Sequence, residues 1–526
     1  MKLRMLACFA LVSMSPGADA GSTPPASPPA LQNPDFENDG AGVAAPLAWE
    51  SAGTPDADFT EAGGRAGAFR LTHYSAAGFE VVTSQKFKAP NPGWYSFRTW
   101  VRRSNGENSS QVEVRCGQRT DRVDVPVAWP NQWLQVVVSF QAGTDPCELA
   151  LRTRAAGGQW SHFDAITVEP GAPRLSILGA DVSSLKKSED FGGQYFDTRP
   201  QLPKQGSRRK SANALEVLSR HGFNYVRLRV WVNPADGYHD QEELFEMASR
   251  ASFSGQKTLI DLHYSDSWAD PGKQFKPAAW SNYTFEQLKK AVYDHTYGVC
   301  QGLRARGMNP AMIQLGNELN SGMLWPDGHT WNPPNWDNLA QLLNAGAAAV
   351  RACSQRTRIM LHLANGGDNG LYRWWFDNIT SRGVDFDVIG FSYYGFWHGS
   401  LGDLQTNLND ISARYSKDVV VAETAYPFVL ADADGWGNII GLPNQLVAGY
   451  PATPEGQAAN QRDVLSIVRA VPNGRGLGAF YWDATWTGVI GNGWDPTNPA
   501  SGNAWENQAL FDFEGYPVPA MDVFRP

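Results

Sequence analysis

The stretch AMIQLGNELN (residues 311–320) is a short apolar run that ends in a polar signature, and DVVVAETAYP (418–427) repeats this arrangement. We interpret each run as a buried strand with a carboxylate at its C-terminal tip, Glu318 in the first and Glu423 in the second. In a (β/α)8 barrel, catalytic groups stand at this end of the strands. Because two glutamates in one cleft are suited to glycosidic bond cleavage, the two stretches predict both the fold and the chemistry.

A single glutamate after an apolar run is more often a surface residue or a neighbour of a helix N-cap. This alternative explains the pair less well than either glutamate alone, because Asn317 directly precedes Glu318. In barrel glycosidases an amide before the acid/base can hydrogen-bond the sugar 2-hydroxyl in the transition state, where that bond is most useful. We therefore interpret both glutamates as catalytic.

Strand-like segments alternate with amphipathic helical segments from about residue 175, which is typical of a parallel α/β fold. The candidate strands lie in 174–185, 224–232, 257–266, 311–320, 357–364, 386–395, 418–427 and 476–486. Eight strand–helix units fit one closed barrel with enlarged loops. A doubly wound open sheet is the weaker alternative, because no Gly-rich phosphate-binding turn follows the first strand. We predict a (β/α)8 TIM barrel over residues 175–526.

Residues 31–170 have a different pattern, in which short alternating runs are separated by Gly, Asn and Pro turns. This pattern is typical of an all-β sandwich. The segments LQNPDFE and HFDAITVEP resemble the first and last strands of jelly-roll carbohydrate-binding modules. We predict a jelly-roll domain that binds carbohydrate or acts as a spacer. The candidates for exposed aromatic side chains are Trp49, Tyr74, Trp94 and Trp160, with a core role as the alternative for each.

The composition indicates which partners the chain has. Charged residues make up 18% of the 526 residues and the formal net charge is −9, so no basic patch is available for nucleic acid. Aromatic residues reach 12% and include 20 Trp, whose rings can stack on the C–H faces of neutral sugars. This is a weak indication, because most aromatic residues in any protein belong to its core. The length exceeds what one core usually organises, so two globular units are expected.

The N-terminus predicts export. A basic start (MKLR) precedes the apolar stretch LACFALVSM, and ADA (18–20) gives a small-x-small cleavage pattern, so residues 1–20 are interpreted as a signal peptide. Residues 21–30 (GSTPPASPPA) form a Pro/Ser-rich spacer that cannot build a core. We expect a secreted or periplasmic protein that is monomeric and has no membrane segment once the signal is removed.

Four cysteines remain after removal of the signal, which contains Cys8. An even number suits an oxidising compartment, and none of the four shows metal-ligand spacing. We predict one disulfide in each domain, Cys116 with Cys147 and Cys300 with Cys353. Free buried thiols are the alternative.

Polar residues at the C-terminal ends of the candidate strands would converge on one pocket in a barrel. The set comprises Asp181, Arg229, His263, Asp266, Asn317, Glu318, Tyr393, Glu423 and Trp482. Arg229 and Tyr393 are expected to hold Glu423 ionised and to lower its pKa, as a nucleophile requires. Desolvation and repulsion from Glu423 should instead raise the pKa of Glu318, because a general acid starts protonated. A core role is the alternative for the histidine and the tryptophan of this set.

Several long segments resemble a single enzyme family. They include NYVRLRVWVNPADG (224–237), LIDLHYSDSWADPGKQFKPAAW (259–280), IQLGNELNSGMLWPDG (313–328) and DVIGFSYYGFWHGSL (387–401). These segments are similar to those of the arabinogalactan endo-β-1,4-galactanases of glycoside hydrolase family 53. Matching segments extend over most of residues 178–518 and are rich in Trp, His and Asp. The match is therefore specific to the family, and not only to its clan of retaining barrel glycosidases.

The resemblance implies endo-hydrolysis of β-1,4-galactosidic bonds in plant cell-wall galactan and arabinogalactan, with no cofactor for the chemistry. Glu318 would be the acid/base and Glu423 the nucleophile. The residues that would surround the subsite at the cut are Asp181, Arg229, His263, Asn317, Tyr393 and Trp482. Those that would extend the sugar-binding groove are Trp268, Trp325, Trp397 and His398. A β-1,4-xylanase, mannanase or glucanase of the same clan is the first alternative, and a carbohydrate-binding barrel without activity is the second.

The segment ADADGWGN (431–438) predicts a Ca2+ site. It places Asp432, Asp434, the backbone carbonyl of Trp436 and Asn438 at alternate positions around a Gly-rich turn, which is an oxygen-only arrangement. Bacterial members of the family with a similar loop bind calcium there. The alternative is a simple Asp/Gly turn, and the segment 491–505 is short for the remaining ligands.

Overall fold

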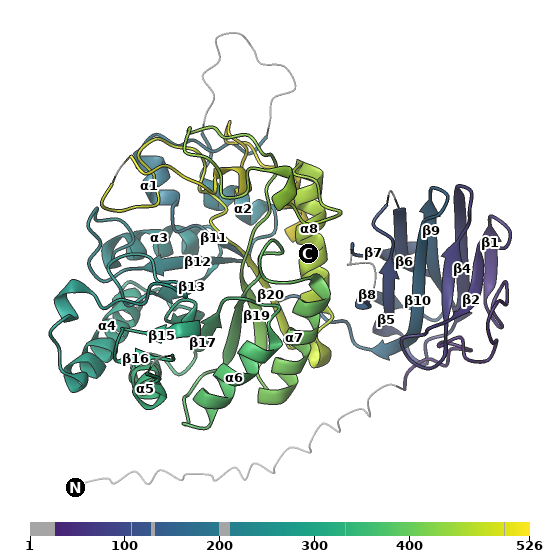
Figure 1. Cartoon of the computed structure of the whole chain (residues 1–526), viewed down its shortest axis with the longest axis horizontal. Coiled ribbons are helices and arrows are strands. Elements are labelled where there is room, and N and C mark those ends of the chain that lie inside the picture. The colour runs from purple at the N-terminus through teal and green to yellow at the C-terminus, as the bar shows by residue number, and fades with distance from the viewer. Residues whose placement is uncertain are drawn as a thin grey trace, which may run out of the picture.

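The chain folds as an antiparallel β-sandwich followed by a closed β/α barrel (Figure 1). A computed structural model describes residues 27–106, 108–127, 132–198, 211–331, 333–498 and 500–525. The predicted fold class is confirmed. The predicted signal peptide with Cys8, and residues 21–26 of the predicted spacer, lie outside the described residues. Within those ranges, no helix has the length and apolar character needed to cross a membrane.

The sandwich consists of two five-stranded sheets, with the orders β1-β4-β9-β6-β7 and β2-β3-β10-β5-β8. Its strands are β1 (Glu50–Gly53), β2 (Asp58–Ala62), β3 (Phe69–Tyr74), β4 (Phe79–Phe87), β5 (Gly93–Arg103), β6 (Asn108–Cys116), β7 (Arg119–Asp124), β8 (Leu134–Ala142), β9 (Cys147–Ala155) and β10 (Trp160–Pro170). Strand β8 shows why they form: Leu134, Val136 and Phe140 are buried, while Gln135 and Gln141 alternate with them on the other face.

The barrel closes in the order β11-β12-β13-β14-β17-β18-β19-β20, and β20 pairs with β11. Its strands are β11 (Ile177–Asp181), β12 (Tyr225–Val230), β13 (Lys257–Leu262), β14 (Met312–Leu315), β17 (Arg358–Leu363), β18 (Val388–Ser392), β19 (Asp418–Thr424) and β20 (Gly476–Tyr481). A small hairpin, β15 (Gly322–Met323) and β16 (Gly328–His329), follows β14. The α-helices are α1 (Leu185–Asp190), α2 (Ala214–Arg220), α3 (Gln241–Phe253), α4 (Phe285–Ala305), α5 (Trp336–Cys353), α6 (Asn369–Thr380), α7 (Leu401–Tyr415) and α8 (Pro454–Arg469). Short 3-10 helices are η1 (Ala278–Trp280), η2 (Leu319–Ser321), η3 (Pro443–Gln445), η4 (Pro472–Gly474), η5 (Glu506–Gln508) and η6 (Pro519–Phe524).

The barrel interior changes from apolar to polar along the strands. A separate apolar cluster includes Leu259, Met312 and Met360, which come from β13, β14 and β17. Two residues further along the same strands, the side chains are the buried Asp261, Gln314 and His362. Because side chains at i and i+2 share one face of a strand, the polar layer lies directly above the apolar one. The apolar layer therefore supports a polar floor near the C-terminal ends of the strands.

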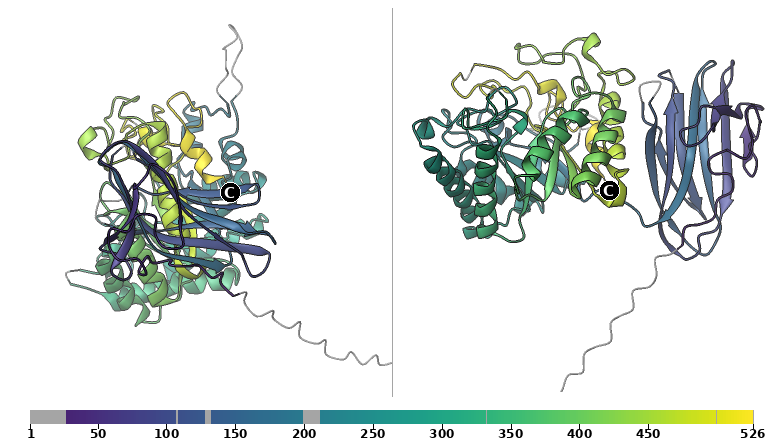
Figure 2. Two further views of the ribbon diagram at one scale, coloured as in Figure 1. Left: turned by 90° about the vertical axis from the view of Figure 1, so that its right-hand side faces the viewer. Right: turned by 60° about the horizontal axis from the view of Figure 1, so that its bottom comes forward.

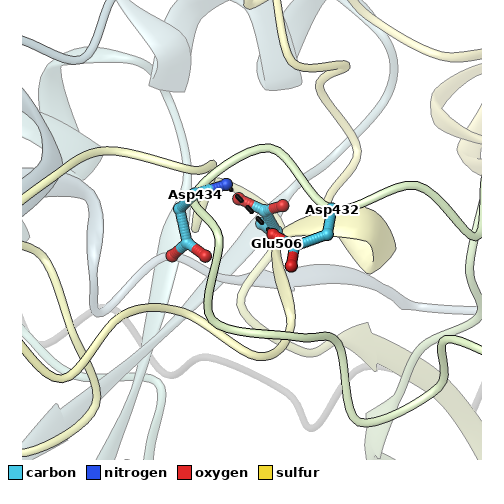
Figure 3. Close-up of side chains that lie close together, drawn as sticks. All are labelled: Asp432, Asp434 and Glu506. Atoms are coloured by element: carbon cyan, nitrogen blue, oxygen red, sulfur yellow. Dashed lines mark hydrogen bonds between the residues drawn. The ribbon is translucent and has the colours of Figure 1, made fainter.

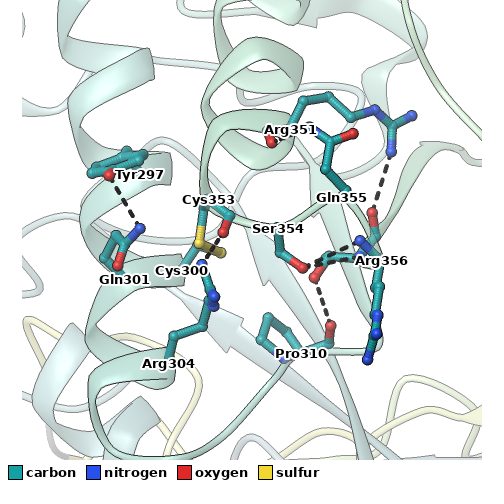
Figure 4. The surroundings of a disulfide bond; sticks show 11 residues. Tyr297, Cys300, Gln301, Arg304, Pro310, Arg351, Cys353, Ser354, Gln355 and Arg356 are labelled. Carbon is teal, nitrogen blue, oxygen red and sulfur yellow. Dashed lines mark hydrogen bonds between the residues drawn. A yellow bond between two sulfur atoms is a disulfide. The ribbon is translucent and has the colours of Figure 1, made fainter. Parts of the chain in front are cut away.

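Disulfides fix both parts of the chain, and both predicted pairings are confirmed. Cys116 and Cys147 are register partners on β6 and β9. Cys300 and Cys353 join α4 to α5, the two helices that flank β14 in the sequence (Figure 4). Helix α4 begins at a capping box formed by Thr284, which is one reason the chain becomes helical at that point.

The sandwich contacts the barrel at helices α7 and α8 (Figure 2). The side chain of Gln405 on α7 accepts a hydrogen bond from Gln135 N (2.8 Å) and donates one to Gln135 O (2.9 Å). Gln135 belongs to β8, which is the last strand of its sheet, so this amide satisfies backbone groups of an edge strand. The guanidinium of Arg98 donates to Ala470 O (3.1 Å), just after α8.

Candidate active site

Glu318 follows β14 in a tight turn with left-handed backbone. Gly316 has φ of 78°, and Glu318 itself has φ of 47° and ψ of 58°. A left-handed non-glycine residue costs about 1–3 kcal/mol, so the surrounding structure must enforce it. The Ser392 hydroxyl, at the end of β18, donates to Glu318 Oε1 (2.7 Å). The half-buried carboxyl is therefore held at the mouth of the barrel.

Glu423 lies near the end of β19 and is held by two groups. Arg227 Nη1 lies 2.8 Å from Glu423 Oε1, and the Tyr394 hydroxyl donates to Glu423 Oε2 (3.0 Å). The backbone of Ser392 is the register partner of Glu423, at an irregularity in the β18–β19 pairing. Ser392 thus pairs with one glutamate through its strand and bonds to the other, Glu318, through its hydroxyl. The two carboxyl groups flank the end of the same strand.

The side chains of Arg229 and Tyr393 are not the partners of the Glu423 carboxylate, and both of these predictions are wrong; Tyr393 meets Glu423 only through its backbone N–H, which donates to Glu423 O (2.8 Å). Arg229 stacks over the ring of Trp268 at 4.0 Å and lies 3.5 Å from a buried aspartate, Asp483. Positions 227 and 229 share one face of β12, so the alternation could not tell which arginine reaches Glu423. The Tyr393 hydroxyl donates to Gly399 O (3.1 Å), which leaves the next tyrosine to face the carboxylate.

Burial dominates the electrostatics of both glutamates. Burial, together with repulsion from Glu423, raises the pKa of Glu318 to about 8, while the Ser392 hydrogen bond acts in the opposite direction. Burial also raises the pKa of Glu423 to about 7, although Arg227 and the Tyr394 hydrogen bond act in the opposite direction. The prediction that polar partners bring the pKa of Glu423 below its ordinary value is wrong, because burial outweighs them. The expected rise in the pKa of Glu318, from burial and from the charge of Glu423, agrees with these directions.

Arg227 is shared among carboxylates, which explains why it does not hold Glu423 more firmly ionised. Its guanidinium also contacts Asp181 Oδ2 (3.0 Å) and Asp261 Oδ2 (2.7 Å). The charges of these two aspartates raise the pKa of Glu423 in turn. One arginine therefore serves three buried carboxylates.

Asn317 and His263 are held by internal hydrogen bonds. Asn317 Nδ2 donates to Ala269 O (2.8 Å), and its Oδ1 accepts from Arg227 Nη2 (2.9 Å). His263 Nδ1 accepts from the Ala269 backbone N–H (3.1 Å), which leaves Nε2 as the donor to Asp261 (3.0 Å). Both side chains orient the floor of the site through these bonds.

Aromatic rings from several loops stand around the two glutamates. The ring centroids of Trp268 and Trp482 lie 6.1 Å apart, and Trp482 meets Trp505 at 4.6 Å. Trp397, which is 50% exposed, lies 6.1 Å from Trp505 and 5.8 Å from Tyr394. The structure thus brings Trp268, Trp397 and Trp482 together with a tryptophan that the sequence analysis did not select.

The remaining predicted residues lie near the rim of the site or hold its loops in place. His398 packs its ring against Tyr394 at 5.6 Å. Trp325 donates from Nε1 to Ser321 O (2.9 Å) in the loop after Glu318. Asp266 accepts hydrogen bonds from the backbone N–H groups of Asn233 (3.0 Å) and Ala278 (2.8 Å), so it fixes two loops together.

The residues that sequence reasoning missed are Arg227, Ser392, Tyr394 and Trp505. Arg227 alternates with Arg229 in YVRLRV, and Tyr394 adjoins Tyr393 in SYYG, so the signal was present with two candidates at each place. Ser392 directly precedes that pair of tyrosines. For Trp505, which lies in a long loop after β20, the local sequence carries no signal.

A second acidic group lies in the loops after β19 and β20 (Figure 3). Asp432, Asp434 and Glu506 each offer a carboxylate oxygen, and the three oxygens lie within 4.8 Å of one another. Glu506 is buried, and its Oε2 has no hydrogen-bond partner in the described part of the chain. Burial and the two aspartates raise the pKa of Glu506 to about 7. Of the predicted ligands, Asn438 donates from Nδ2 to Ala431 O (2.9 Å), and its Oδ1 makes no bond with the described residues.

Comparisons with known proteins bear on the barrel. The sequence profile of the family described as Glycosyl hydrolase family 53 matches residues 177–524. An endo-beta-1,4-galactanase of Bacillus subtilis is 36% identical over 383 residues, which cover 66% of this chain and 85% of that protein. An arabinogalactan endo-beta-1,4-galactanase of Cellvibrio japonicus is also 36% identical, over 64% of this chain and 86% of that protein. The catalytic domain of the same family from Ignisphaera aggregans superimposes with a TM-score of 0.62 at 39% identity, over 68% of this chain and 97% of that domain.

Proposed function

Because this chain belongs to glycosyl hydrolase family 53, we propose that it cleaves internal β-1,4-galactosidic bonds of galactan and arabinogalactan with retention of configuration. One observation carries this proposal: two carboxyl groups flank the end of β18 in opposite surroundings. Glu423 faces a cation and a phenol, whereas Glu318 receives one neutral hydroxyl. This is the division between nucleophile and acid that a double displacement needs. The names of the relatives support β-1,4-galactan as the substrate.

In the first step, Glu423 attacks the anomeric carbon while the protonated Glu318 gives its proton to the departing glycosidic oxygen. The bond to the leaving chain breaks as the glycosyl–Glu423 ester forms. In the second step, Glu318, now ionised, takes a proton from water as the water oxygen attacks the anomeric carbon and releases Glu423. Arg227 and Tyr394 stabilise the carboxylate of Glu423 before and after each displacement.

The function is tested by reducing-sugar release from unbranched β-1,4-galactan, arabinogalactan, xylan, mannan and soluble cellulose derivatives. Rapid release from the first two is expected. Release from xylan, mannan or cellulose with none from galactan would replace the proposal by the corresponding hydrolase of another substrate. Binding of galactan without any turnover would leave a carbohydrate-binding barrel.

The two carboxyl groups set the pH dependence of kcat/KM. Glu318 must be protonated, so activity is lost as the pH rises through its pKa of about 8. Glu423 must be ionised, so activity is lost as the pH falls through its pKa of about 7. We expect a narrow bell whose limbs belong to the interacting pair.

Ser392→Ala provides the check on this profile. The Ser392 hydrogen bond lowers the pKa of Glu318, so its removal should move the basic limb of the bell to higher pH. A stationary basic limb in a folded Ser392→Ala variant would contradict the assignment of that limb to Glu318.

We also propose that the acidic group in Figure 3 holds a structural Ca2+. Its donor set is all oxygen, and the unpaired buried Glu506 Oε2 fits a hard cation. The proposed ligands are Asp432 and Asp434, joined by Glu506 in addition to the predicted carbonyl of Trp436 and side chain of Asn438. Such an ion would tie the loop after β19 to the loop after β20.

Ca2+ should raise the thermal midpoint of unfolding, and chelation should lower it. A ligand at a hundredfold excess over Kd stabilises the native state by about 2.7 kcal/mol. Glu506→Gln should lose the response, whereas Asp495→Asn, which changes a carboxylate outside the group, should keep it. An equal response to Ca2+ in both variants would place the ion elsewhere.

For residues 31–170 we propose galactan binding at a pair of aromatic side chains on neighbouring strands of the sandwich. Tyr74 and Trp160 are register partners on β3 and β10, and Tyr74 is 38% exposed. Trp49 belongs to the core, with Nε1 donating to Asn33 O (3.1 Å). The guanidinium groups of two arginines lie over the ring of Trp94.

A galactan-containing affinity gel tests this proposal on the whole chain. Tyr74→Ala/Trp160→Ala should migrate faster than the parent, and the control Trp94→Ala should be retarded like the parent. If the double variant is retarded as strongly as the parent, the sandwich is a structural domain.

Export and a monomeric state complete the proposed function. The N-terminal sequence pattern and two disulfides support export, because disulfides persist in oxidising compartments. N-terminal sequencing of the exported protein tests export, and the mature chain is expected to begin after residue 20. The sedimentation coefficient tests the monomeric state.

A further inference from the structure

A row of aromatic side chains runs outward from the loops beside the acid/base. Phe275 and Trp325 have ring centroids 5.5 Å apart, and Trp325 and His329 are 4.9 Å apart. The backbone of Trp331 donates to His329 Nδ1 (3.0 Å), and the ring of Trp331 lies 5.1 Å from that of Trp374 on α6. These five residues are the aromatic row. Its inner part lies in the loops after β13 and β14, and its outer part reaches helix α6.

The aromatic row is tied to the loop of Glu318 at both ends. At the inner end, Gln274 Nε2 donates to Glu318 O (3.3 Å), and Gln274 O accepts from the Trp325 backbone N–H (2.7 Å). At the outer end, Trp375 Nε1, next to the last residue of the row, donates to Leu319 O (2.8 Å). The row is therefore continuous with the catalytic rim and fixed relative to it.

The aromatic row is exposed and carries no unbalanced charge. Phe275 is 62% exposed, Trp331 52% and Trp374 36%. The adjacent Lys276 forms an ion pair with Asp327 at 2.5 Å, so its charge is compensated. Exposed aromatic side chains that gather in one row are typical of an interaction site. A surface of rings without free cations suits a neutral polysaccharide better than an acidic one.

We propose that the aromatic row binds the leaving-group side of a long galactan chain, beyond the subsites next to the cut. This inference rests on the proposed function. Glu318 protonates the departing oxygen, so the departing chain begins on the side of Glu318, which is where the row starts. Each ring offers a face to the C–H groups of one galactosyl residue. Trp331 and Trp374 form the outermost platform.

The test compares a polymer with a short substrate, using kcat/KM for unbranched galactan and for galactotriose. Trp331→Ala/Trp374→Ala should lower the value for galactan about tenfold, the effect of about one to two lost aromatic contacts, and so lower the polymer-to-trisaccharide ratio. Trp331→Tyr/Trp374→Tyr keeps two rings and should recover most of the ratio. The control Phe253→Ala removes a 90% exposed ring at the end of α3 and should match the parent.

Each other outcome overturns the inference. Unchanged kcat/KM on both substrates in the alanine variant would show that the row does not contact the chain, and equal losses on both substrates would show general damage to the barrel. Dissociation of a parental dimer by the alanine pair, seen by sedimentation velocity, would make the row a self-interface. If the parent cleaves another polysaccharide but not galactan, the proposed function fails. The ratio of kcat/KM for that polymer to kcat/KM for its trisaccharide then tests whether the aromatic row binds the leaving-group side of the chain. If it cleaves none, both fail.

Discussion

Glu423→Ala is expected to abolish turnover of every substrate, activated or not. Without the carboxylate no glycosyl ester can form, and the buried position leaves a vacancy beside Arg227 and Tyr394. One cation and one hydroxyl donor then face an empty space, which suits a small anion. Added azide should enter it, attack the anomeric carbon from the same side as the lost carboxylate, and release an α-galactosyl azide from a β-galactoside.

Glu423→Gln is the matched control. It is equally unable to form the ester, but its amide fills the vacancy, so azide should restore little. The measurement is the anomeric configuration and yield of the azide product by NMR. A β-configured azide product from Glu423→Ala would show that another residue is the nucleophile. Hydrolytic activity that remains in this variant without added azide would show the same.

Glu318→Ala is expected to separate substrates by their leaving groups. Cleavage of galactan should fall about 10²- to 10⁴-fold, the usual effect of losing a general acid. An aryl β-galactoside with a good leaving group needs little protonation, so its first step should survive and the glycosyl enzyme should accumulate. Azide should then attack that intermediate and give a β-galactosyl azide, the opposite configuration to the one expected from the Glu423 variant.

The pH profile gives an independent check on Glu318→Ala. Because Glu318 is assigned the basic limb of the bell, the variant should lose that limb on the aryl substrate. Equal losses on galactan and on the aryl galactoside, or an α-configured azide product, would show that the roles of the two glutamates are reversed.

Sequence reasoning placed both glutamates because a strand that ends in a carboxylate is a local pattern. It failed where two neighbouring residues of one type compete. Arg227 and Arg229 share one face of β12, and their distance from the carboxylate depends on how deep each lies in the closed barrel. Tyr393 and Tyr394 lie after an irregularity in strand pairing, which decides the direction of each side chain and leaves no trace in composition.

Contacts between residues far apart in the sequence were the second kind of feature that the sequence did not predict. Glu506 joins Asp432 and Asp434 only because the loops after β19 and β20 meet in space. The contact between Gln405 and the edge strand β8 likewise depends on how two domains dock. The fold could be predicted because its signal repeats in every strand, whereas these contacts are each made once.

The left-handed backbone of Glu318 creates a conflict between catalytic activity and thermal stability. Its dihedral angles suit glycine, its half-buried carboxyl is partly removed from water, and a second carboxylate repels it. All three would be relieved by glycine at this position, which would also remove the carboxyl group that we propose as the acid. Selection for heat resistance alone is therefore expected to favour glycine in place of Glu318, and so to favour inactive variants. Directed evolution of a hardier enzyme has to monitor catalysis in every round and to take its gains from surfaces distant from the turn.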